Sequence, residues 1–409
     1  MRGAAWAALA SLVVPMVCIG PSTTARAEST NPCESSSRWV AAEPAAFGQL
    51  GIRNAWKLSD GAVRVAVVDS GVNDDNPHLR GRVVKGTAVF GSGDGTTDSY
   101  GTGTAIASQI AAAKVDGSGL EGVAPEARIV PVRAYESLQS ETGAPNADRI
   151  AKGIAWASSQ QGVKVIVVGQ ATLTDSAALR SAVAKATKAG ALVVAAAGDS
   201  SLRTDNKQTG PLLTYPAAYP EVIGVTAVDA QGQATAATLG GAQVSLAAPG
   251  MSVLAAQGNG DCVLSGAQPT SALATGYVGG IAALVAAAHP KETPADWRYR
   301  LLATALRPTP QTRSNATGWG IVAAYPAINF VNDGTRPGPP NPRFPDSSSP
   351  TATPTPLPAP PDGEQDRTQL IAGVLGFAAI AVVAAGLLIG QAVRRRRSST
   401  APDDRDAQA

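Results

Sequence analysis

Five short runs of apolar and β-branched residues, with helix-like segments between them, constrain the fold of this chain most strongly. The runs lack polar alternation, which is typical of strands that are buried on both faces of a sheet. Helical patterns cover 104–113, 147–160 and 177–188. This alternation predicts an α/β fold, with a mostly parallel sheet and helices on both faces. The five runs are Val63–Val68, Ile129–Arg133, Val163–Val168, Leu192–Ala196 and Val222–Thr226.

The composition supports a large folded domain. Of the 409 residues, 44% are apolar and 16% are charged, which suits a filled core better than a disordered chain. The formal net charge is only +2, so the chain has no electrostatic footprint for nucleic acid.

Residues 1–27 have the features of a secretory signal peptide. Arg2 supplies a positive start, Ala4–Cys18 is mostly apolar, and Ala25–Ala27 is a suitable cleavage site. A first transmembrane anchor is the alternative, but two prolines interrupt a short run. The sequence therefore predicts an exported chain.

The cysteines fit an exported chain. Removal of the signal peptide takes away Cys18 and leaves Cys33 and Cys262. An even pair in an oxidising compartment predicts a disulfide between Cys33 and Cys262, with two free thiols as the alternative.

The C-terminal part predicts a membrane anchor. Residues 335–368 are rich in Pro, Ser and Thr, and such a segment is an extended spacer rather than part of a core. Residues 369–393 are apolar over a length that spans a bilayer, and 394–409 begin with four arginines. The positive-inside rule places this tail in the cytoplasm and the large domain, on the other side of the span, outside.

Short motifs stand at the ends of predicted strands and at the starts of predicted helices. Val67-Val68-Asp69-Ser70-Gly71 ends the first strand, and Thr270-Ser271-Ala272-Leu273-Ala274 opens an apolar helical segment. With the segments between them, they resemble the ordered motifs of subtilisin-like serine proteases. The other matching segments are Tyr100–Ala107, Ala195–Asp199, Tyr215–Val225, Leu246–Gly250 and Gly318–Val322.

The layout of the whole chain resembles one branch, the mycosins of actinobacterial type VII secretion systems. The matching parts are the signal peptide, an N-terminal extension over 28–60, the subtilisin-like domain over 61–334, the linker and the single span. The resemblance implies the subtilisin-like three-layer fold, with one C-terminal transmembrane helix. It also implies a place on the outer face of the cell membrane, with subunits of the type VII secretion membrane complex as partners.

The family's catalytic residues are only partly present. The resemblance places Asp69 at the aspartate of the catalytic triad, Thr102 at the histidine, and Ala272 at the serine. It places Asp199 at the asparagine that binds the oxyanion. A threonine hydroxyl is no general base near neutral pH, and alanine has no nucleophilic atom. Family membership alone suggests a serine endopeptidase, but these residues predict that the chain is not an enzyme.

Other residues could supply the missing groups if the alignment were shifted. A gap of one residue would make Ser271 the nucleophile. The two histidines offer no evident base: His78 is expected in a surface loop, and His289 at the end of a helix. No lysine occurs between Lys207 and Lys291.

The sequence predicts no cofactor and no metal centre of His and Cys ligands. Loop acids would allow a structural calcium ion, although such acids are usually just solvated. They are Asp74, Asp75, Asp94 and Asp98.

The sequence-based hypothesis is a catalytically inactive subtilisin-like pseudoprotease. It would be a structural or regulatory component of a type VII secretion system, anchored on the outer face of the membrane. One alternative is an active serine endopeptidase of the mycosin family that uses shifted residues. The other is a module that binds peptides or cell-wall material in the cleft.

Overall fold

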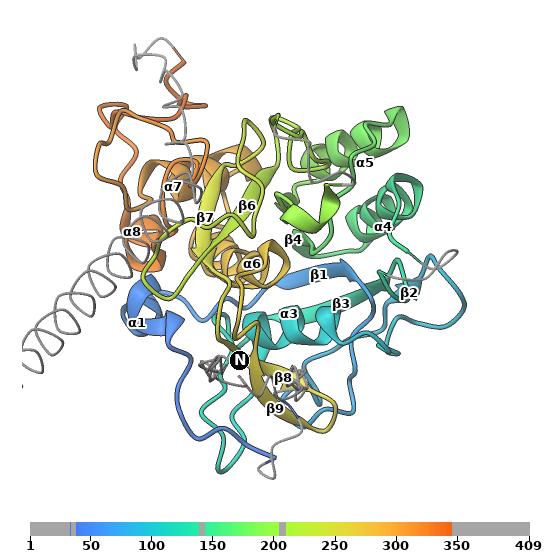
Figure 1. Ribbon diagram of the computed structural model, residues 1–409. Coiled ribbons are helices and arrows are strands. Elements are labelled where there is room, and N and C mark those ends of the chain that lie inside the picture. The colour runs from blue at the N-terminus through green and yellow to red at the C-terminus, as the bar shows by residue number, and fades with distance from the viewer. Residues whose placement is uncertain (1–32, 34–37, 139–143, 204–209, 346–409) are drawn as a thin grey trace, which may run out of the picture. The chain divides into compact units, whose positions relative to one another are not determined.

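A computed structural model describes residue 33 and residues 38–138, 144–203 and 210–345 (Figure 1). The predicted signal peptide, most of the linker, the predicted span and the basic tail lie outside these residues.

A seven-stranded sheet forms the centre of the domain, with the strand order β2-β3-β1-β4-β5-β6-β7. All neighbours in this sheet are parallel. A separate antiparallel pair, β8 and β9, lies outside it. The strands are β1 Arg64–Asp69, β2 Thr87–Ala88, β3 Arg128–Arg133, β4 Val163–Val168, β5 Leu192–Ala196, β6 Ile223–Val228, β7 Leu246–Pro249, β8 Val253–Gln257 and β9 Gly260–Leu264.

Helices cover both faces of the sheet, as predicted. Side chains of β1 alternate between two cores: Val65 and Val67 pack with α3 and α6, whereas Ala66 and Val68 pack with α4 and α5. Figure 1 shows these helix pairs in separate layers. The helices are α1 Ala46–Leu50, α2 Ile52–Ala55, α3 Thr102–Ala111, α4 Ala147–Ser159, α5 Ala177–Lys188, α6 Ser271–Ala288, α7 Pro294–Ala303 and α8 Ala324–Asn329. The predicted α/β fold, with a parallel sheet between two helix layers, is therefore confirmed.

Helix α6 is apolar on all sides because it runs through the core. Of the described residues, this helix alone is long and apolar enough to cross a membrane, yet 83% of it is buried inside the domain. Its glycines allow close packing: a Cβ on Gly279 would stand 2.5 Å from Val167 of the sheet. Burial inside the domain and packing against the sheet identify α6 as a core helix.

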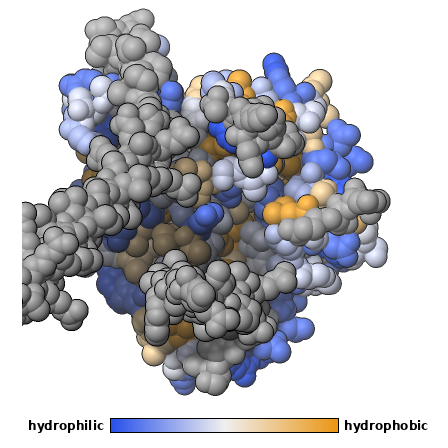
Figure 2. Space-filling model, viewed as in Figure 1, coloured by the Kyte–Doolittle hydropathy of each residue, from blue (hydrophilic) through white to orange (hydrophobic). Residues whose placement is uncertain are grey.

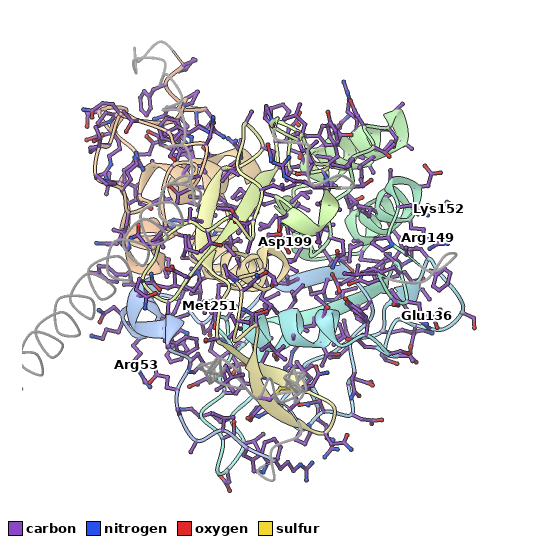
Figure 3. The ribbon with its side chains drawn as sticks, in the orientation of Figure 1. Arg53, Glu136, Arg149, Lys152, Asp199 and Met251 are labelled. Carbon is purple, nitrogen blue, oxygen red and sulfur yellow. A yellow bond between two sulfur atoms is a disulfide. The ribbon has the colours of Figure 1, made fainter. Side chains whose placement is uncertain are left out.

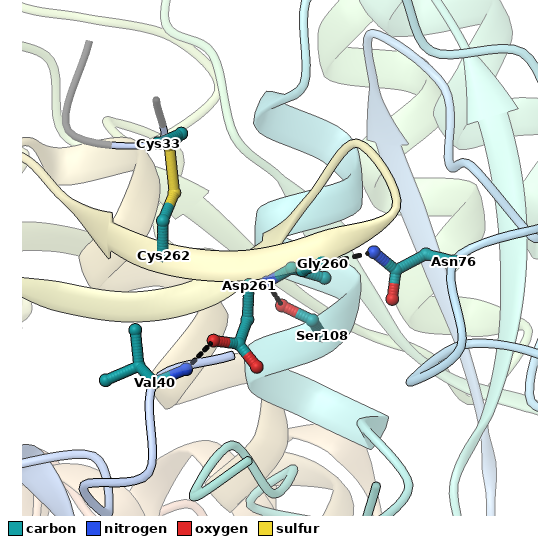
Figure 4. The surroundings of a disulfide bond; sticks show 8 residues. Cys33, Val40, Asn76, Ser108, Gly260, Asp261 and Cys262 are labelled. Carbon is teal, nitrogen blue, oxygen red and sulfur yellow. Dashed lines mark hydrogen bonds between the residues drawn. A yellow bond between two sulfur atoms is a disulfide. The ribbon is translucent and has the colours of Figure 1, made fainter. Parts of the chain in front are cut away.

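The N-terminal extension is joined to the β8–β9 hairpin. Cys33 and Cys262 form a disulfide, with 5.3 Å between their Cα atoms, as the cysteine count predicted (Figure 4). Next to it, the Asp261 carboxylate accepts a hydrogen bond of 2.7 Å from the backbone N–H of Val40. Ser118 donates a further bond of 2.6 Å to the same carboxylate.

The two histidines occupy different environments. The prediction of a surface loop is wrong for His78, whose side chain is fully buried. Its Nε2 lies 3.0 Å from Asp261 and its Nδ1 lies 2.7 Å from the Ala113 carbonyl. Both partners are distant in sequence, which is why a local pattern missed them. His289 lies at the end of α6, as predicted, and its Nε2 lies 2.8 Å from the carbonyl oxygen of Ile328.

Candidate functional site

A cleft of about 850 Å³ lies where the parallel strands end and two helices begin. Residues that follow β4 and β5 form one part of its wall, and the first turns of α3 and α6 form another. Thr102, Asp199 and Ala272 all line this cleft. In Figure 2, hydrophobic colour appears near the centre of the visible face and in patches closer to its upper and right edges, interspersed with hydrophilic colour.

Asp69 lies immediately behind the cleft wall. It is the last residue of β1 and is fully buried. Gly169 lines the cleft after β4, and a Cβ on it would stand 2.2 Å from Oδ2 of Asp69. Because β1 and β4 are parallel neighbours, their carboxyl ends meet at one edge. The structure therefore brings Asp69, Thr102, Asp199 and Ala272 to one cleft.

The Asp69 carboxyl has one satisfied oxygen and one free oxygen. Oδ1 accepts hydrogen bonds from the Tyr135 hydroxyl at 2.8 Å and from the Ser70 N–H at 2.8 Å. Among the described residues, Oδ2 has no hydrogen-bond partner. Burial raises the pKa of Asp69 to about 7, against the opposing effect of the bonds from Ser70 and Tyr135. The carboxyl therefore changes its protonation near neutral pH.

Two residues that the sequence did not indicate complete this network. Tyr135 follows β3 and is buried, and its hydroxyl reaches Asp69 because β3 pairs with β1 in register. Gln170, on the cleft wall, donates a hydrogen bond of 3.0 Å to the Tyr135 hydroxyl. Thr102 also exchanges a hydrogen bond with Tyr135. The only sequence signal near Tyr135 was the predicted strand that precedes it, Ile129–Arg133. That strand did not indicate the hydrogen bond from Tyr135 to Asp69.

Asp98 fixes the start of α3. Its Oδ1 accepts a hydrogen bond of 2.7 Å from the N–H of Gly101, and its Oδ2 accepts one of 2.8 Å from the N–H of Thr104. These bonds satisfy N–H groups that the first turn of a helix leaves free. The described residues contain no group of three or more His, Cys, Asp or Glu side chains that could hold a metal. Of the acids considered for calcium, Asp98 caps the start of α3.

Asp199 holds the first turn of α6. Its Oδ1 accepts a hydrogen bond of 2.8 Å from the N–H of Ser271, and the Ser271 side chain also bonds to it. Burial raises the pKa of Asp199, and the two bonds from Ser271 oppose this rise. Figure 3 shows Asp199 beside α6. A carboxylate at this end of a helix is favourable because the helix dipole is positive there.

Ser271 and Ala272 are both buried, with 2% and 9% of their surface exposed. Helix α6 begins at Ser271, where the sequence predicted a helix start. Gln109 of α3 donates a hydrogen bond of 2.8 Å to the carbonyl oxygen of Leu273, so the helices that carry Thr102 and Ala272 are joined directly.

Replacing Asp69 with asparagine should remove a pH-dependent part of the stability. A carboxyl whose pKa is higher in the folded chain retains its proton while the unfolded chain has lost it. The wild-type free energy of unfolding should therefore fall as pH rises from about 4 to about 7, by about 4 kcal/mol, and stay level above. Denaturant unfolding from pH 4 to pH 8 should show this fall in the wild type and lose it in Asp69→Asn.

Asp74→Asn is the matched control for this measurement, because Asp74 is exposed and lies in the loop after β1. It should keep the wild-type pH profile. A profile that Asp69→Asn leaves unchanged would show that Asp69 does not titrate in this range.

Comparison with known proteins identifies related chains. The Subtilase family model matches residues 60–320. Subtilisin E of Bacillus subtilis (strain 168) is 35% identical over 245 residues, which are 59% of this chain and 60% of subtilisin E. The match therefore leaves two fifths of that relative's length uncovered.

Solved mycosin structures share the fold. The MycP3 protease from the type VII (ESX-3) secretion system is 28% identical, with a TM-score of 0.62, over 71% of this chain and 89% of that one. A structure of an intact ESX-5 inner membrane complex contains a chain that is 26% identical, with a TM-score of 0.63, over 86% of this chain and 90% of that one.

These relatives correct one prediction. Thr102 and Ala272 predicted a chain that is not an enzyme, but the relatives are subtilisins and mycosin proteases. The comparison points to a family of serine proteases, and the two residues do not by themselves remove the chain from it. The chain belongs to the subtilase family, and its neighbours among solved structures are mycosins.

Proposed function

We propose that this chain is a mycosin-type subunit of a type VII secretion membrane complex, with a structural or regulatory role. The observation that carries the proposal is the similarity to a chain of the ESX-5 inner membrane complex over 86% of this sequence. That likeness extends beyond the 59% shared with subtilisin E.

The proposed topology follows from the sequence. Residues 1–27 are a signal peptide, 335–368 a spacer, 369–393 a membrane span, and 394–409 a cytoplasmic tail. The subtilisin-like domain would lie on the outer face of the membrane, where the oxidising compartment suits its disulfide.

The cleft is proposed to hold an extended segment of polypeptide. Asp69, Thr102 and Ala272 would occupy the triad positions, and Asp199 the oxyanion position. The cleft is large enough for several side chains, and Leu138 and Leu173 line it while remaining 41% exposed. Exposed apolar side chains in a concave site are typical of ligand-binding surfaces.

Co-purification tests the place in the complex. The tagged full chain, taken from gently solubilised membranes of its own host, should elute with other membrane subunits of the secretion complex. A matched variant that ends after residue 368 lacks the predicted span and should lose this association or weaken it. Elution of the full chain alone would contradict the proposal.

A serine endopeptidase is the second candidate, favoured by its relatives' names. The purified protein would be treated with a fluorophosphonate probe, which labels activated serines. Ser271 is the hydroxyl nearest to Ala272 in sequence, and it bonds to Asp199. Labelling of Ser271 that Ser271→Ala abolishes would establish this function, and an unlabelled protein would count against it.

A further inference from the structure

We infer that the cleft selects polypeptide segments that present a lysine or arginine side chain to Asp199. The inference rests on the proposal that the cleft binds polypeptide, and it names the chemical class of ligand. The feature that would select such a ligand is the negative charge of Asp199 on the cleft wall.

Asp199 is the only charged residue among the described residues that line the cleft. The rest of the lining consists of apolar side chains, glycines, hydroxyl groups and amides, so no described lining residue carries a positive charge to neutralise it. A single uncompensated charge in a partly enclosed site gives that site a definite electrostatic sign. The wall therefore favours a cation over an anion.

The carboxyls around the wall have the same sign. Asp69 lies behind Gly169, and Asp98 lies at the start of α3, close enough to Asp69 to raise its pKa. Both contribute negative charge when they are ionised. An anionic ligand would meet repulsion from Asp199 and Asp98, and from the ionised fraction of Asp69, which adds to the discrimination against anions.

The position of Asp199 leaves it able to bind a ligand. Ser271 holds one side of the carboxylate through its N–H and its side chain. A carboxylate has about four acceptor positions, so these bonds leave capacity for a further donor. Asp199 is only half-buried and faces the cleft, so a ligand ammonium or guanidinium group can reach it.

Burial also makes this carboxylate responsive to a cation. Its pKa is raised because the surrounding protein disfavours the charged form. A cation beside it would offset that cost and stabilise the ionised form. A charge-assisted hydrogen bond in a partly desolvated site is stronger than the same bond in water. A basic side chain is therefore the ligand group that gains the most binding free energy from this carboxylate.

Peptide binding to the full chain in detergent tests the inference. The probes are fluorescent peptides of alanine and leucine that carry one lysine, one norleucine or one glutamate at a scanned position. Norleucine has the same four-carbon side chain as lysine but lacks the charged ammonium group. Fluorescence anisotropy should show the lysine peptide binding about tenfold more tightly than the norleucine peptide, and the glutamate peptide most weakly.

Asp199→Asn removes the charge and retains an acceptor for the Ser271 N–H, so the start of α6 is preserved. In this variant the preference for lysine over norleucine should fall to about twofold or less. Asp116→Asn, an exposed acid outside the cleft, should keep the wild-type preference. Thermal unfolding of the three proteins checks that all are folded.

The outcomes separate the two proposals. Equal binding of lysine and norleucine peptides by the wild type would overturn the selectivity and leave the peptide-binding cleft in place. A preference that Asp199→Asn retains would overturn the role of Asp199. Failure of every peptide to bind would overturn the proposed cleft function itself.

Discussion

A chain with histidine at position 102 and serine at position 272 is expected to hydrolyse peptide esters at least about 100-fold faster than the unsubstituted chain. Thr102→His supplies an imidazole that can accept a proton, and Ala272→Ser supplies a hydroxyl that can attack a carbonyl carbon. Both positions line the same cleft, and the structure already holds an aspartate behind them.

The geometry around Asp69 favours this gain. A base imidazole needs an acceptor for its second N–H, which fixes its orientation and stabilises its charged form. Oδ2 of Asp69 has no partner among the described residues, whereas Oδ1 is occupied by Tyr135 and Ser70. A new imidazolium beside Asp69 would also favour the ionised carboxylate and oppose the effect of burial on its pKa.

The single substitutions are the controls. Nucleophile and base act as a unit, so neither Thr102→His nor Ala272→Ser alone should approach the rate of the pair. Initial rates with a chromogenic peptide ester give the comparison. Addition of Asp199→Asn should raise the rate further, because an amide can donate to the oxyanion. A folded double variant with an unchanged rate would contradict the proposed equivalence of these positions.

The central strands could be predicted because their burial leaves a plain local signal. Strands β4 and β5 and helix α5 have the predicted bounds, Val163–Val168, Leu192–Ala196 and Ala177–Lys188. The hairpin of β8 and β9 was not predicted. It lies outside the main sheet. The apolar run of β8 is only four residues long, Val253–Ala256, and β9 mixes buried and half-exposed residues, so neither strand gave a clear local signal.

The site was predictable to the extent that it depends on chain order. Motifs at strand ends and helix starts indicated Asp69, Thr102, Asp199 and Ala272, and parallel strands bring such positions to one edge. The bond from Tyr135 depends on the register of β3 against β1, which no local pattern specifies.

Loss of the disulfide is expected to lower the free energy of unfolding by about 5.5 kcal/mol, because the disulfide closes a very long loop. The cross-link joins Cys33 to Cys262 across 229 positions, so it removes much conformational freedom from the unfolded chain. Denaturant unfolding of Cys33→Ser/Cys262→Ser, compared with the wild type, measures this difference.

The folded state should survive this change because other bonds hold the same segment. Arg38 donates a hydrogen bond of 2.7 Å to the carbonyl oxygen of Asn259, and the Asp261 carboxylate accepts one from Val40. The far-ultraviolet circular dichroism of the variant should therefore match that of the wild type. Asp261→Asn in the oxidised chain removes the buried charge beside His78 and Ser118 but retains the cross-link. Reduction of the wild-type protein should lower the free energy of unfolding as much as the two serine substitutions do. A decrease below about 1 kcal/mol in both cases would refute the entropic effect.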